Sequence, residues 1–75
     1  MPSELANKAI ELLSPTIGDF LARAKVRAAC NMSGADIDTL TRAQLGPFAD
    51  QFELVCKTSL GADTAKRLKE ALQRG

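Results

Sequence analysis

The 75-residue chain contains no His, Trp or Tyr, and its ten basic residues nearly balance its nine acidic ones, leaving a net charge of +1. This length is enough for one small domain, 1–75, and too short for two stable cores. The balanced charge gives no general attraction to nucleic acid, an anionic membrane or an acidic substrate. No apolar run approaches the roughly 20 residues that cross a bilayer, the start lacks signal-peptide character, and two Cys are too few for a disulfide scaffold. We therefore expect a cytoplasmic protein with no membrane contact.

Two helices are predicted in the first half of the chain, at about 4–13 and 15–32. Ser3 belongs to the residue types preferred at a helix N-cap, and apolar residues at three- and four-residue spacing follow it. The pair Ser14-Pro15 is expected to end the first helix, because the residue before a proline is disfavoured in the α conformation. Pro15 then becomes the first residue of the second helix, where its missing N–H costs nothing.

The helix at 15–32 has two apolar faces of unequal strength. The stronger face, which carries the larger side chains and is expected to point into the core, consists of Ile17, Phe20, Leu21, Ala24, Ala28 and Met32. The weaker face consists of Ala22, Val26, Ala29 and Cys30. A helix with two apolar faces is usually central in its bundle. Gly34 is expected to end this helix in the left-handed conformation.

The second half of the chain is predicted to form a short helical turn and two further helices, at about 42–45, 47–60 and 64–73. Thr41 and Gln44 have the spacing of a capping box. Pro47 is expected to separate the turn from the helix after it, since proline inside a helix clashes with the preceding turn. A single kinked helix that continues from Arg42 remains the alternative. Nothing alternates with the period of a half-buried strand, so the predicted fold is all-α, a compact bundle of four main helices.

Few residues in the chain are suited to catalysis or metal binding. Asp36 and Asp38 have the spacing of the first two ligands of a calcium loop, but Pro47 occupies the position of its bidentate glutamate. Cys30 and Cys56 lie among apolar residues at helical spacing, as buried free thiols do. Two thiols cannot complete a zinc site, and without His there is no ordinary base to activate a thiol. We predict no cofactor and no metal site, and we expect that the protein is not an enzyme.

The sequence therefore favours, by elimination, a small non-catalytic module that binds another protein or a second copy of itself. Four short helices with this much apolar surface are expected to leave part of it exposed as a docking surface. The residues predicted for that surface are Ala22, Val26, Ala29, Phe48 and Phe52. The opposite interpretation, in which both apolar faces pack inside a monomer, stays open.

Two other hypotheses remain from different functional classes. An accessory nucleic-acid-binding domain would use a basic patch on the last helix, with Lys66, Arg67 and Lys69 as the cations that contact phosphate. A redox- or metal-responsive switch would act through Cys30 and Cys56.

Overall fold

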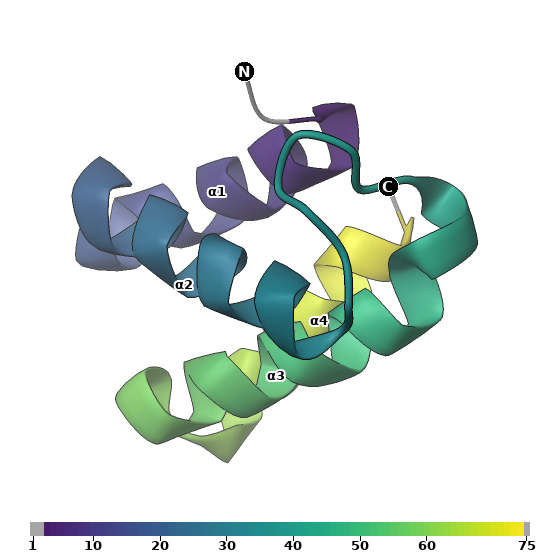
Figure 1. The fold of residues 1–75 in the computed structure, drawn as a ribbon. Coiled ribbons are helices and arrows are strands. Elements are labelled where there is room, and N and C mark those ends of the chain that lie inside the picture. Colours follow the sequence, from purple (N-terminus) through teal and green to yellow (C-terminus); the bar gives the residue numbers. More distant parts are fainter. Residues whose placement is uncertain (1–2, 75) are drawn as a thin grey trace.

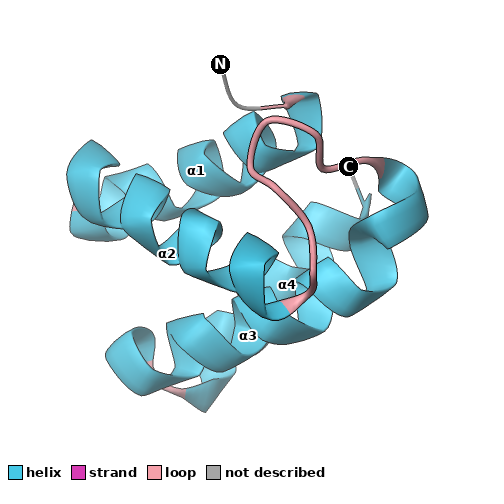
Figure 2. Ribbon diagram, viewed as in Figure 1, coloured by secondary structure: helices cyan, strands magenta, loops and turns pink. Residues whose placement is uncertain are grey.

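Four α-helices and one 3₁₀ turn make up most of residues 3–74, the part of the chain that this computed structural model describes (Figures 1 and 2). In chain order the elements are α1 (Glu4–Ile17), α2 (Asp19–Met32), the 3₁₀ turn η1 (Arg42–Gln44), α3 (Leu45–Leu60) and α4 (Ala62–Arg74). No strand occurs within residues 3–74. The predicted all-α fold is confirmed.

Several helix ends follow the capping rules that the sequence suggested. The Ser3 hydroxyl accepts a hydrogen bond from the amide of Ala6 at 3.2 Å, which satisfies one of the free N–H groups at the start of α1. Beyond α2, Gly34 has a φ of 78°, and the amide of Ala35 donates to the carbonyl of Cys30 at 2.8 Å. Gly34 therefore ends α2 in the left-handed conformation, as predicted.

The predicted boundary between the first two helices is wrong. α1 continues through Ser14 and Pro15 to Ile17, and the chain turns at Gly18 instead. Pro15 cannot donate to the carbonyl four residues back, at Glu11, but both residues are exposed, so water can reach the unpaired carbonyl. The extra turn brings Ile17 against the core, and this packing offsets the cost of the proline.

The start of α3 differs from the prediction by two residues. η1 ends at Gln44 and α3 follows it directly at Leu45, so the turn and the helix are contiguous. The amide of Thr41 donates to Oε1 of Gln44 at 3.2 Å, as expected for the predicted capping box. Pro47 lies in the first turn of α3, where its missing N–H would have had no helical partner in any case.

The helices pack in chain order, and α4 returns to contact α1 as well as α3. In Figure 1 α2 lies between α1 and α3, and the long loop after α2 crosses to the start of α1. There the amide of Ser3 donates to the carbonyl of Ile37 at 2.9 Å, and the side chain of Leu40 is buried in the core. The loop is thus held against the start of α1 and against the core.

The core consists mainly of aliphatic side chains and alanines, with one aromatic pair at its centre. Phe48 and Phe52 on α3 are fully buried, and their ring centroids are 5.8 Å apart with 29° between the planes. This offset arrangement is favourable for aromatic rings. No charged or polar residue is buried within residues 3–74. Apolar packing is therefore the main stabilising interaction.

We expect the substitution Leu13→Ala to lower the free energy of unfolding by about 2–5 kcal/mol, because it leaves a cavity in a fully packed site. A domain of this size has roughly 4–11 kcal/mol of stability in total, so the variant should be partly unfolded at moderate temperature. Urea denaturation followed by circular dichroism measures the effect. Leu54→Ala removes the same atoms from a 48% exposed site and should change the stability by less than about 0.5 kcal/mol. Equal losses in the two variants would contradict this description of the core.

We expect Gly18→Ala to lower the free energy of unfolding by about 1–3 kcal/mol, because Gly18 has φ 85° and ψ 162°, a region reserved for glycine. No atom lies within 4 Å of the position that a Cβ would take there, so the cost is strain of the backbone alone. Thr16→Ala, at an exposed helical position two residues earlier, is the matched control and should be nearly neutral. A neutral Gly18→Ala variant would mean that the turn between α1 and α2 is not as described.

Candidate functional site

The surface predicted from the sequence lies in the core of the protein. Its five residues share an exposed fraction of 0%: Ala22, Val26, Ala29, Phe48 and Phe52. α2 packs between α1 and α3 through its small side chains, which allow the helix axes to come close together. The prediction that these residues form an exposed docking surface is therefore corrected by their burial. The larger side chains of the stronger apolar face, Phe20, Leu21 and Met32, point outward instead of into the core. Ile17, predicted on the same face, lies on α1 and packs against the core.

One face of α2 carries exposed large apolar side chains, and we call it the outer face of α2. Its residues are Phe20, Leu21, Ala24, Ala28 and Met32, together with Arg23 and Arg27. Phe20 is 85% exposed, and Leu21 and Met32 are 51% and 52% exposed. One other large apolar side chain within residues 3–74 is comparably exposed, Leu54 on α3. Exposed apolar surface is therefore concentrated on α2, which is typical of a docking surface.

A shallow depression of about 270 Å³ lies on this outer face and is lined by Phe20, Arg23, Ala24 and Arg27. These four residues have the spacing of one helix face, and the small Ala24 forms the low point between larger neighbours. Neither guanidinium forms an ion pair with any residue between 3 and 74. The depression thus combines an apolar floor with two positive charges that have no carboxylate partner in the described part of the chain.

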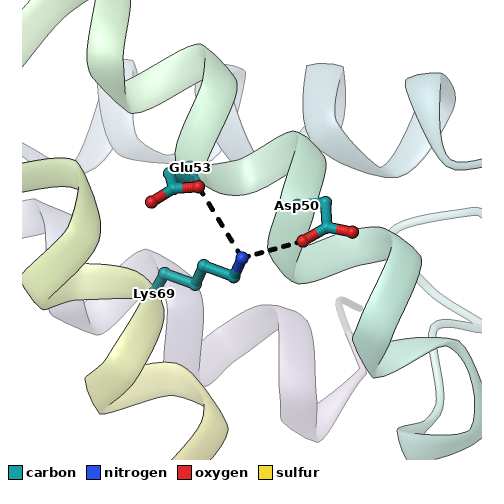
Figure 3. Close-up of polar contacts among 3 residues, drawn as sticks. All are labelled: Asp50, Glu53 and Lys69. Carbon is teal, nitrogen blue, oxygen red and sulfur yellow. Dashed lines mark hydrogen bonds and ion pairs between the residues drawn. The ribbon is translucent and has the colours of Figure 1, made fainter. Parts of the chain in front are cut away.

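The predicted basic patch on α4 is only partly available. Lys66 and Arg67 are exposed, whereas Nζ of Lys69 lies 2.8 Å from Oδ1 of Asp50 and 3.6 Å from Oε1 of Glu53 (Figure 3). The hydrogen bond that Lys69 donates to Asp50, together with the charge of both carboxylates, raises the pKa of Lys69. Lys69 therefore connects α4 to α3, and its two carboxylate partners compete with phosphate for it.

The two cysteines are free and buried, with exposed fractions of 0% for Cys30 and 1% for Cys56. Burial raises the pKa of each thiol to about 11, and the carboxylate of Asp36 adds to the effect at Cys30. At Cys56 the charge of Lys25 acts in the opposite direction. Both groups are therefore neutral thiols near pH 7, whereas a reactive cysteine is an accessible thiolate.

A larger and more polar groove, of about 690 Å³, lies between α1 and the segment that leads into η1. It is lined by Glu4, Leu5, Asn7, Lys8, Glu11, Leu40, Thr41 and Arg42. Acidic and basic side chains alternate along it, so its charges favour no single ligand chemistry. Within residues 3–74 no three His, Cys, Asp or Glu residues are grouped closely enough to hold a metal ion. In the same range no helix has both the length and the apolar character needed to span a bilayer.

Comparison with known proteins adds no functional assignment, since the chain matches no protein-family model, no curated protein and no solved structure. The outer face of α2 was missed by the sequence analysis, although one signal for it was present. Arg23 and Arg27 follow Phe20 by three and seven residues, so burying Phe20 on that face would bury two guanidinium groups as well.

We expect the free energy of unfolding to fall as the pH rises from 9 to 11. A thiol whose pKa is raised from 9.0 to about 11 by folding holds its proton more tightly in the native state. The contribution of each thiol to the free energy of unfolding is fully present below pH 9 and is lost progressively above it. The loss is at most on the order of 2–3 kcal/mol per thiol. Urea denaturation at several pH values measures the slope.

The double variant Cys30→Ala/Cys56→Ala is the control for this pH dependence, because it removes both thiols and keeps Lys69, whose pKa is also raised. Its stability should decline less over the same range. Identical slopes in the two proteins would contradict a thiol origin.

Proposed function

We propose that the protein is a small non-catalytic interaction module that binds another protein through the outer face of α2. The observation that carries this proposal is the exposure of Phe20, the one aromatic side chain outside the core. Burying a Phe side chain contributes roughly 1.5–3 kcal/mol relative to leaving it exposed. This stabilisation is absent while Phe20 is in water, and a partner that covers the ring would provide it. The two free thiols are compatible with the expected reducing cytoplasm.

The geometry of the helix supports an external partner for Phe20. At about 100° per residue, Phe20 and Ala22 lie on nearly opposite sides of α2. Ala22 is fully buried against neighbouring helices, so Phe20 cannot enter the same core without reversing the helix. No segment within residues 3–74 covers Phe20, and an external partner is the occupant that this geometry supports.

Nucleic-acid binding through α4 has less support. Lys69 is held by two carboxylates, and within residues 3–74 no large apolar side chain is exposed on that helix for base stacking. Lys66 and Arg67 alone would offer two exposed charges. A redox switch also has less support, because Cys30 and Cys56 are buried neutral thiols.

We expect a photoreactive phenylalanine analogue at position 20 to form a covalent adduct with a protein partner in the source cell, and the same analogue at position 54 to form none. Both positions are exposed, but only the first lies on the outer face of α2. Excess unlabelled native protein should suppress the adduct, whereas the variant Phe20→Ser/Leu21→Ser should not. Adducts of equal yield at both positions, equal suppression by the variant, or no adduct at position 20 would each contradict the proposal. Unchanged thermal unfolding of the variant confirms that it is folded.

A further inference from the structure

We infer that the partner segment at the outer face of α2 is an acidic amphipathic helix, with apolar side chains on one side and carboxylates along its edges. This inference rests on the proposed function and adds the chemistry of the partner.

The charge of α2 is uniformly positive beyond its first residue. After Asp19 the helix carries Arg23, Lys25 and Arg27 and no further acid. Both arginines line the apolar depression, and no residue between 3 and 74 forms an ion pair with them. A guanidinium can bind a carboxylate through two parallel hydrogen bonds, which fixes orientation as well as adding affinity. The complementary partner surface is therefore one that carries Asp or Glu.

The shape of the face favours a helix as the partner. Phe20, Ala24 and Ala28 follow one another at four-residue spacing and form a ridge that is high at Phe20 and low at the alanines. An apolar side chain from a crossing helix can enter above Ala24, next to the ring of Phe20. This is the arrangement in which an amphipathic helix lays its apolar face against a complementary surface.

A second copy of this chain is a poorer occupant. In a two-fold arrangement each subunit presents the same face to the other. Arg23 and Arg27 of both copies would then lie in one interface, and Asp19 is the only acid of α2 that could compensate their charge. Juxtaposed like charges oppose association by several kcal/mol, so self-association through this face is disfavoured.

The test uses two synthetic peptides of about 15 residues, close to the length of α2. Both have the same Leu and Ala face, and the edges carry Glu in one peptide and Lys in the other. Each is titrated into ¹⁵N-labelled protein and followed by amide chemical shifts. We expect the Glu peptide to shift resonances of α2 and to bind about tenfold more tightly than the Lys peptide, with the difference decreasing at high salt.

Charge reversal tests the roles of the two arginines. The variant Arg23→Glu/Arg27→Glu should lose its preference for the Glu peptide and bind the Lys peptide instead. The matched control Lys66→Glu/Arg67→Glu also reverses two exposed charges, on α4, and should keep the preference of the native protein. An unchanged preference in the first variant, an equal effect of the control, or no shift on α2 with either peptide would overturn the inference.

Other partner classes are separate outcomes of the same titration. Vesicles that contain phosphatidylserine test an anionic membrane, and a single-stranded oligothymidylate tests nucleic acid. Stronger shifts of α2 resonances with either probe than with the Glu peptide would overturn the acidic helix. The proposed function has its own test at position 20. An adduct there, combined with no charge preference in the titration, would reject the acidic partner and leave the protein-binding surface in place.

Discussion

Close packing of α2 against its neighbours through side chains no larger than valine is the constraint on which the rest of the structure depends. Ala22, Val26 and Ala29 are fully buried, and α2 contacts both α1 and α3. Small residues at a helix contact allow a short distance between the two helix axes. Backbone and Cβ atoms then fill the space between the helices. The larger side chains of the same helix then have no room inside. Phe20 is exposed because the interior is already full.

The aromatic pair on α3 complements this arrangement. A domain of 75 residues buries a modest fraction of its surface, and alanines contribute little volume to its core. Phe48 and Phe52 supply the bulk that α2 lacks, and their stacked rings occupy the centre of the bundle. The ion pairs of Lys69 connect α3 to α4 outside this core, at the surface, where such contacts contribute little to stability. Ion pairs between helices therefore contribute little to the choice of which helix faces lie inside.

Much of the fold could be predicted from the sequence because helix ends depend mainly on local chemistry. Ser3 and Gly34 are at helix ends as expected, since their effects involve only neighbouring backbone groups. The end of α1 could not be predicted in this way. The preference against helix before Pro15 is local, but the packing of Ile17 against the core is a tertiary contact that outweighs it. A local rule gives no measure of such a contact.

The sequence reduces the candidate site to a choice between two faces of one helix, and total hydrophobicity predicts the wrong face to be buried. Phe20 and its apolar neighbours exceed the opposite face in hydrophobicity, yet they alternate with Arg23 and Arg27, whose burial without a partner would cost far more than an exposed ring. The opposite face has no charge and fits its neighbours closely. Compatibility with charge and shape thus decides burial. Besides the close packing of the opposite face, Arg23 and Arg27 keep Phe20 in water, and the same two side chains give the exposed surface its positive charge.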